Sequence, residues 1–220
     1  GVLIARGLAE QTGKRIRLST KAIVGATSKG VSGQVDAMFV AGAPPDAAVM
    51  MIGANDVTAL NGISQSAQRL GRAVRKLRTR GAVVIVGTCP DLGLIAAIPQ
   101  PLRSLAHART SQLARAQAAC VRAAGGVPVP LAHLLAHQFR ATPELMFSAD
   151  GFHPSPTAYA LAARSLLVAL CDELGEQVDS PVPDSPAPSE TPVLGAAHTR
   201  RSVMPRLWHR PVPGSPAPSS

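Results

Sequence analysis

The stretch DAAVMMIGAND, residues 46–56, decides the fold of this chain. The run AAVMMI within it is apolar without interruption, which is typical of a short strand that is buried on both faces of a sheet. A second run of this kind, AVVIVGTCP at residues 82–90, follows a helical pattern at residues 65–80. Two buried strands with a helix between them predict a parallel sheet that is covered by helices.

The segments on either side continue this alternation of helix and strand. Alternating β-branched residues predict a strand over residues 15–24, and VPVP at 127–130 predicts a short last strand. Apolar residues at helical spacing, together with glycine and proline stops, predict further helices over residues 1–12, 101–124 and 155–174, and a short helix after the glycine-rich turn at 25–30.

Composition separates a domain from a tail. In residues 1–175 we expect one α/β domain, with a mainly parallel sheet between two layers of helices. Residues 176–220 contain SPVPDSPAPSETP and PVPGSPAPSS, which are rich in proline and serine and poor in residues that build a core. We expect this tail to be disordered.

The sequence contains no run of 18 or more apolar residues, so we expect no membrane span. No positively charged start with an apolar run and a cleavage site opens the chain, so no signal peptide is visible. Residue 1 need not be the natural start of the protein, and the compartment therefore stays open, with the cytoplasm slightly favoured.

The formal net charge of +9 raises the question of a nucleic-acid partner. Much of this charge lies in RLGRAVRKLRTR, residues 69–80, where Leu70, Val74 and Leu77 recur at helical spacing and the basic residues occupy the other faces. A solvated helix face explains the pattern, and a surface for anionic lipid or nucleic acid is the alternative. Aromatic residues make up only 3% of the chain, which leaves few for base stacking, so we expect no nucleic-acid partner.

We also find no pattern for a metal or a cofactor. The three cysteines form no CxxC pair and resemble small buried apolar residues. His133 and His137 have the i, i+4 spacing of some metal ligands, but they lack the glutamate of HExxH and a third ligand. GATSKG at residues 25–30 lacks the GK[ST] ending of a phosphate loop. We therefore expect neither a metal nor an organic cofactor.

An open parallel sheet binds its ligands at the carboxyl ends of its strands, and three segments of the sequence fit this position. Gly25 lies at the turn after the predicted strand at 15–24, and GAND at 53–56 follows the buried strand directly. The third segment is DGFHP at residues 150–154, just before the last helix.

In this order and spacing, GATS, IGAND and DGFHP resemble the conserved blocks of the SGNH (GDSL-type) hydrolase family. Gly25 matches the glycine of the second block, Asn55 the asparagine of GxND in the third, and Asp150 and His153 the DxxH of the fifth. The resemblance covers residues 1–174. It implies a flavodoxin-like three-layer α/β/α fold with a five-stranded parallel sheet.

The resemblance also implies a role in ester hydrolysis for each matched residue. His153 is the general base, and Asp150 orients its imidazole and stabilises the charged form. The backbone N–H of Gly25 and the side-chain N–H of Asn55 form the oxyanion hole. The structural alternatives stay open: a satisfied His153 with Asp150 as a helix cap, a tight turn at Gly25, and turn hydrogen bonds at Asn55. We expect Asp56 to be structural and to bond backbone groups of its own turn.

The family's nucleophile, the serine of a GDS motif after the first strand, is not found in this sequence. The only Asp-Ser pairs, at 179–180 and 184–185, lie in the proline-rich tail. We therefore expect a chain that starts after the nucleophile block and lacks the first strand, which in this family lies inside the sheet. Each buried group left unpaired costs about 1–3 kcal/mol, so we expect this chain to fold poorly by itself.

Our leading hypothesis is an esterase or acyl hydrolase that acts on a small-molecule or lipid ester through a serine acyl-enzyme. We expect the present chain to be a monomer and to be inactive without its nucleophile block. The alternative is a non-catalytic SGNH-fold binding module that has lost its chemistry, and a weaker one is a flavodoxin-like regulatory or nucleotide-binding domain. LGLIAAIP at 92–99 fits an acyl-chain pocket and core packing equally well, so the substrate stays open.

Overall fold

The computed structural model describes residues 1–40 and 42–175, which lie in the first of two units of the chain, Gly1–Ser180. The predicted disordered tail lies outside the described residues. The elements, in chain order, are α1 (Val2–Thr12), α2 (Val31–Val40), β1 (Ala47–Met51), α3 (Ala54–Thr58), α4 (Ile63–Arg78), β2 (Val83–Gly87), the 3₁₀ helix η1 (Leu92–Leu94), α5 (Leu102–Ala123), β3 (Val127–Val129), α6 (Leu131–Leu134), α7 (Ala136–Ala141), α8 (Pro143–Met146) and α9 (Pro156–Leu174).

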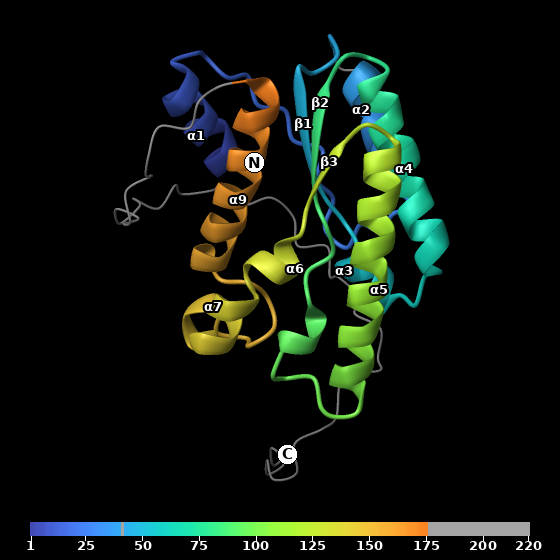
Figure 1. Cartoon of the computed structure of the whole chain (residues 1–220), viewed down its shortest axis with the longest axis vertical. Coiled ribbons are helices and arrows are strands. Elements are labelled where there is room, and N and C mark those ends of the chain that lie inside the picture. The colour runs from blue at the N-terminus through green and yellow to red at the C-terminus, as the bar shows by residue number, and fades with distance from the viewer. Residues whose placement is uncertain (41, 176–220) are drawn as a thin grey trace, which may run out of the picture. The chain divides into compact units, whose positions relative to one another are not determined.

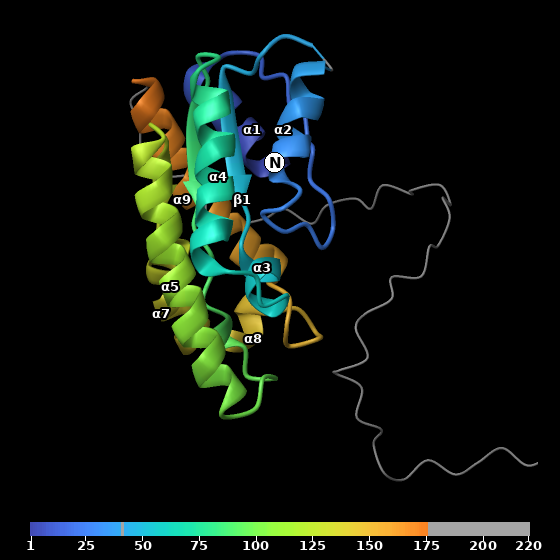
Figure 2. The same cartoon turned by 90° about the vertical axis from the view of Figure 1, so that its right-hand side faces the viewer.

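Three parallel strands form the sheet, in the order β1-β2-β3. Ala47 of β1 aligns with Val83 of β2, and Ile85 of β2 aligns with Val127 of β3. Figure 1 shows α1 and α9 on one side of the sheet and α2, α4 and α5 on the other. In Figure 2 the helices α4 and α5, which contact each other, lie side by side in this second layer. The predicted α/β class with a parallel sheet is confirmed.

Each face of β2 has its own hydrophobic core. Val84 and Val86, at 1% and 0% exposure, pack in one cluster with Leu70 of α4. Ile85 lies in a second cluster with Leu166 of α9. Because successive side chains of a strand point to opposite faces, both cores draw on the same short run. This explains why the apolar run has no polar interruption.

The basic helix α4 is amphipathic, as its sequence predicts. Leu70, Val74 and Leu77 are buried at 0–1% exposure, while Arg72 and Arg75 are exposed. A basic residue in the last turn of a helix also interacts favourably with the carbonyl end of the helix dipole. None of the described helices is long and apolar enough to span a bilayer.

Glycine, serine and proline set the ends of the two helices that cover the other face. Ser155 caps α9 by accepting a hydrogen bond from the N–H of Ala158, and Pro156 opens the helix. Gly13 ends α1 and Gly175 ends α9, both with left-handed φ values of +64° and +71°.

The predicted strand over residues 15–24 is wrong, because these residues form no strand or helix in the structure. Their apolar side chains Ile16, Leu18 and Ile23 are 37–65% exposed. A strand needs a partner edge, and within the described residues β1 pairs with β2 alone. The alternating pattern is that of a strand, but no described strand edge pairs with it. The sheet of the described residues therefore has three of the four strands that the sequence predicted.

Candidate active site

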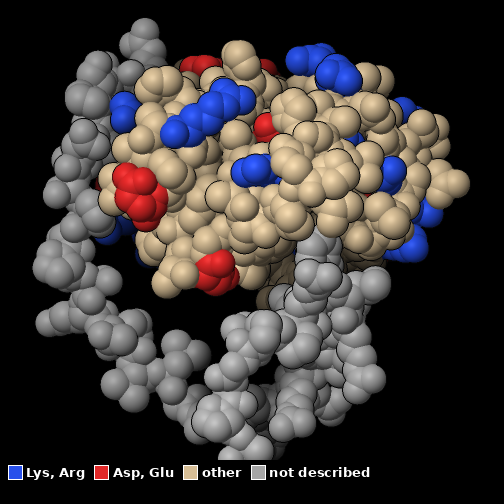
Figure 3. Space-filling view, turned by 90° about the horizontal axis from the view of Figure 1, so that it is seen from below, with Lys and Arg blue, Asp and Glu red and all other residues tan. Residues whose placement is uncertain are grey.

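The carboxyl ends of the strands lie at one edge of the sheet. Asn55 lies at the start of α3, just after β1, while Gly25, Asp150 and His153 lie on loops. Gly53 follows the end of β1, and the segment between α8 and α9 lies at the same lower end of the domain in both cartoons (Figures 1 and 2). Seen from this end, the visible surface is mostly uncharged, with separate basic and acidic side chains (Figure 3). The fold therefore brings these loops to one end of the sheet.

Asp150 and His153 form a compact pair within one loop. The Asp150 Oδ2 atom lies 2.6 Å from His153 Nδ1. The Oδ1 atom accepts hydrogen bonds from the backbone N–H groups of Phe152 and His153, both at 2.9 Å. Ser155, not Asp150, caps the following helix. Asp150 is therefore bonded to the histidine and its own loop rather than to the helix.

The contacts of Asp150 favour its ionised form. The hydrogen bond from His153 is the largest cause that lowers the pKa of Asp150 to about 2, followed by the N–H groups of Phe152 and His153. With an ionised carboxylate as acceptor, Nδ1 of His153 carries a proton and Nε2 of the neutral ring keeps its lone pair. The His153 side chain is 59% exposed, so Nε2 is open to a partner.

Backbone contacts fix this loop at both ends. Ser148 donates its N–H to His153 O at 2.8 Å and its hydroxyl to Pro154 O at 3.0 Å. Ser155 donates its N–H to Met146 O at 2.9 Å. These hydrogen bonds join residues 146–148 to residues 153–155, on either side of the loop. They hold the imidazole of His153 in a fixed position.

The structure brings Asn55 to the loop of Gly25. Asn55 Nδ2 donates to Ala26 O at 3.0 Å, across 29 residues of sequence. A side-chain amide has two N–H donors, so one remains for another acceptor. Gly25 has a φ of +74°, which favours glycine, and no atom lies within 4 Å of the place where a Cβ would stand. Both residues are exposed, so a ligand oxygen can approach either donor.

Gly53, two residues before Asn55, packs closely against Gln117, a residue that sequence reasoning missed. Gly53 has a φ of +137°, and a Cβ there would lie 2.8 Å from Gln117 Nε2. Gln117 is 1% exposed; it accepts from the N–H of Cys89 and donates to Ile52 O, both at 2.8 Å. A polar residue in the buried stripe of a long helix is the signal that could have identified it.

Asp56 is structural, but its side chain bonds other groups than the predicted backbone groups of its own turn. It is 1% exposed, and it accepts from Asn61 Nδ2 at 3.0 Å, which is local. It also accepts from the N–H and the hydroxyl of Ser28 at 2.9 and 2.7 Å, and from the hydroxyl of Ser66 at 2.9 Å. Asp56 thus ties the loop of Gly25 to α3 and α4, next to Asn55.

Two other polar candidates are occupied or buried. Ser28 is 3% exposed and donates its hydroxyl to Asp56, so it is not available as a nucleophile. Burial, with smaller contributions from Asp56 and Asp91, raises the pKa of the Cys89 thiol to about 12. Neither side chain can serve as a reactive nucleophile at neutral pH in this arrangement.

The described residues contain no group of three or more His, Cys, Asp and Glu side chains that could hold a metal ion. His133 and His137 lie on separate short helices, α6 and α7, because the helix breaks at Leu135. Their i, i+4 spacing therefore does not place them on one helix face.

Residues 2–161 match the model of the GDSL-like lipase/acylhydrolase family. The chain belongs to this family. It is thus a member of a family of hydrolases that act on ester bonds, and the matched region includes Gly25, Asn55 and His153. GDSL-like esterase Rv1075c of Mycobacterium tuberculosis (strain ATCC 25618 / H37Rv) is 71% identical over 219 residues, which cover 100% of this chain and 69% of that protein.

Solved structures of low sequence identity share the fold of this family member. Axe2, an acetylxylan esterase from Geobacillus stearothermophilus, has a TM-score of 0.61 and 19% identity, with 80% of this chain and 81% of that chain covered. The lipase/acylhydrolase from Enterococcus faecalis has a TM-score of 0.59 and 19% identity, with coverage of 78% and 84%.

Proposed function

We propose that this chain supplies the base and the oxyanion hole of an SGNH-type serine esterase. His153 is the general base, Asp150 orients its ring, and the N–H groups of Gly25 and Asn55 stabilise the oxyanion. The observation that carries the proposal is the 2.6 Å bond between His153 Nδ1 and Asp150 Oδ2. This bond leaves Nε2 of an exposed imidazole free to accept a proton.

In the proposed reaction a serine hydroxyl attacks the ester carbonyl carbon while its proton moves to His153 Nε2. The oxyanion that forms accepts hydrogen bonds from the Gly25 N–H and from the second N–H of Asn55, since the first one binds Ala26 O. The carbonyl–alkoxy bond then breaks, and His153 returns the proton to the leaving alcohol. Water attacks the acyl-enzyme by the same route, which releases the carboxylic acid and restores the serine.

We propose further that the serine belongs to a GDS block that is not among these 220 residues. The sequence contains no GDS, and Ser28, the serine nearest to Gly25 in the GATS segment, is buried against Asp56. The free edge of β1 in the described sheet also suits a strand that would end in such a motif. By this proposal the 220 residues show little or no turnover by themselves.

The substrate we propose is a small-molecule or lipid ester. The name of the Mycobacterium tuberculosis relative, a GDSL-like esterase, supports an ester in general and no particular acyl group. A panel of p-nitrophenyl esters with acyl chains of different length identifies the preferred acyl group.

The test compares the 220-residue chain with a form extended upstream to include a GDS serine. We expect only the extended form to hydrolyse the esters and to bind a fluorophosphonate probe. His153→Ala removes the general base, so we expect a loss of about 10²–10⁴-fold in kcat. Asn55→Ala removes one oxyanion donor and should cost about 10²–10³-fold.

His137→Ala is the matched control, because His137 is an exposed histidine on another element. Equal turnover by the short and extended forms would refute the proposal that the nucleophile lies outside the 220 residues. Full activity of His153→Ala would refute the role of His153 as general base. A well-folded extended form without turnover or labelling would favour the alternative, a non-catalytic binding module.

A further inference from the structure

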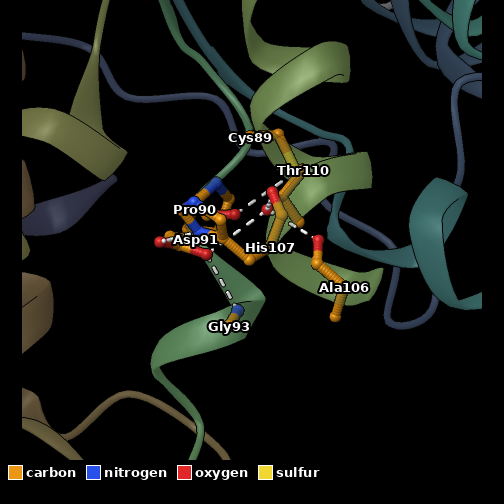
Figure 4. Close-up of polar contacts among 7 residues, drawn as sticks. All are labelled: Cys89, Pro90, Asp91, Gly93, Ala106, His107 and Thr110. Atoms are coloured by element: carbon orange, nitrogen blue, oxygen red, sulfur yellow. Dashed lines mark hydrogen bonds and ion pairs between the residues drawn. The ribbon is translucent and has the colours of Figure 1, made fainter. Parts of the chain in front are cut away.

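A second carboxylate–imidazole pair lies outside the loops proposed for catalysis. Asp91 follows β2, and its Oδ2 atom lies 2.8 Å from Nδ1 of His107 on α5 (Figure 4). The side chain of Asp91 is only 8% exposed, whereas that of His107 is 57% exposed. A buried acceptor therefore holds an imidazole at the surface in one orientation.

Asp91 also has a structural role, but this role does not explain its pairing with His107. Its Oδ1 atom accepts the N–H of Gly93 at 2.8 Å and so caps the short helix η1 (Figure 4). This contact needs one oxygen and no histidine. The other oxygen fixes the ring of His107, so that Nδ1 is occupied and Nε2 stays available.

His107 borders a hollow of about 310 Å³ between the η1 loop and the start of α5. The residues around it are Gly93, Gln100, Arg103, Ser104 and His107. Arg103 and His107 are four residues apart and share a face of the helix. They are the two ionisable side chains of the lining, and neither is acidic.

We propose that this hollow binds a phosphate-type oxyanion. The planar guanidinium of Arg103 suits two oxygens of a phosphate group. Nε2 of His107 accepts a hydrogen bond from a protonated phosphate or, when the ring is charged, donates one to an ionised phosphate. The hollow has the size of a small-molecule site, so the phosphate can be free or part of a larger molecule.

Side chains, not the helix end, make this site. The N–H of Arg103 already donates to Pro99 O at 3.0 Å, and the N–H of Ser104 donates to Gln100 Oε1 at 3.3 Å. Ser104 also donates its hydroxyl to Gln100 Oε1 at 2.8 Å. These contacts fix the backbone and the polar side chains that line the hollow. The guanidinium of Arg103 and the imidazole of His107 remain as the groups that can bind a ligand.

The test is a titration of isotope-labelled protein with inorganic phosphate at constant ionic strength, followed by NMR. The titration uses the 220-residue chain or the form extended upstream, whichever melts cooperatively. Because phosphate binding requires no turnover, the result is independent of the proposed hydrolysis. We expect saturable shifts at Gly93, Arg103, Ser104 and the ring of His107, with a dissociation constant of about 10 mM or lower.

Arg103→Gln should weaken phosphate binding about tenfold or more, and Arg103→Lys, which keeps the charge but not the planar fork, should weaken it less. Arg115→Gln is the matched control, because Arg115 is exposed on the same helix and does not line the hollow. Shifts that do not saturate, or that Arg115→Gln reduces equally, would overturn the proposal.

A second arm identifies the source of the phosphate. Vesicles that contain phosphatidylglycerol are compared with pure phosphatidylcholine vesicles in a sedimentation assay. Retention on the anionic vesicles that is lost in Arg103→Gln supports the site with a lipid phosphate as its ligand. Binding of inorganic phosphate without such retention supports the site with a soluble phosphate.

Discussion

Replacing Asp56 by Asn tests whether the buried carboxylate holds the candidate active site together. Asn has nearly the same shape, so the change creates no cavity. Oδ1 of Asp56 accepts from three side chains, and Oδ2 accepts the N–H of Ser28 at 2.9 Å. The amide oxygen should therefore keep the Oδ1 position, and its NH₂ group then faces the Ser28 N–H.

The magnitude follows from these contacts. The change removes one charge-assisted hydrogen bond, leaves a buried donor unpaired, and makes the three remaining bonds neutral. A hydrogen bond to a charged group contributes about 1.5–3 kcal/mol, so we expect a loss of about 3 kcal/mol in the free energy of unfolding. For a domain of this size, that corresponds to a fall of roughly 6–12 °C in Tm.

The assay is urea denaturation of the form extended upstream, which we expect to unfold cooperatively, followed by circular dichroism, with calorimetry for Tm. Asp36→Asn is the control, because the Asp36 carboxylate is half-exposed and pairs with Lys76 at the surface. Such a pair contributes about 1 kcal/mol or less. If Asp56→Asn unfolds at the same urea concentration as the parent chain, or no earlier than Asp36→Asn, the reasoning is refuted. Ser28→Ala combined with Asp56→Asn should be clearly non-additive, since the two residues share two bonds.

Three further predictions concern folding, titration and thiol reactivity. A form of the chain extended upstream should melt cooperatively, while the 220 residues alone should aggregate or melt broadly; a sharp, soluble melt of the short form would contradict this. The carboxyl of Asp150 should titrate by NMR near pH 2, below its ordinary value of 3.8, and His153→Ala should raise this midpoint. Because the folded-state pKa is the lower one, the contribution of Asp150 to stability is present above pH 3.8 and is lost as the pH falls towards 2; an unchanged midpoint in His153→Ala would contradict the pairing. Burial should keep Cys89 unreactive towards Ellman's reagent at pH 8, while the half-buried Cys120 reacts, and fast labelling of Cys89 would count against its raised pKa.

The features that the sequence predicted well are those that depend on neighbours in the chain. The apolar run of β2 and the helical stripe of Leu70, Val74 and Leu77 are local patterns, and the structure buries them as expected. The run of β1 forms the predicted strand but is only partly buried, with Met51 49% exposed, because β1 lies at an edge of the described sheet. Asp150 and His153 are three residues apart, so one loop suffices to pair them. These elements and this pair therefore follow from local sequence alone.

Pairings between distant segments were decided only by the tertiary structure. Ser28 binds Asp56 across 28 residues, and Gln117 binds the carbonyl of Ile52 across 65, and neither contact has a signature in sequence spacing. The strand predicted at residues 15–24 shows the same limit, because its pattern is right for a strand and the described sheet offers it no partner. A local sequence pattern shows which secondary structure a segment can form. Hydrogen bonds between distant segments depend on which strand edges and side chains the fold places next to that segment.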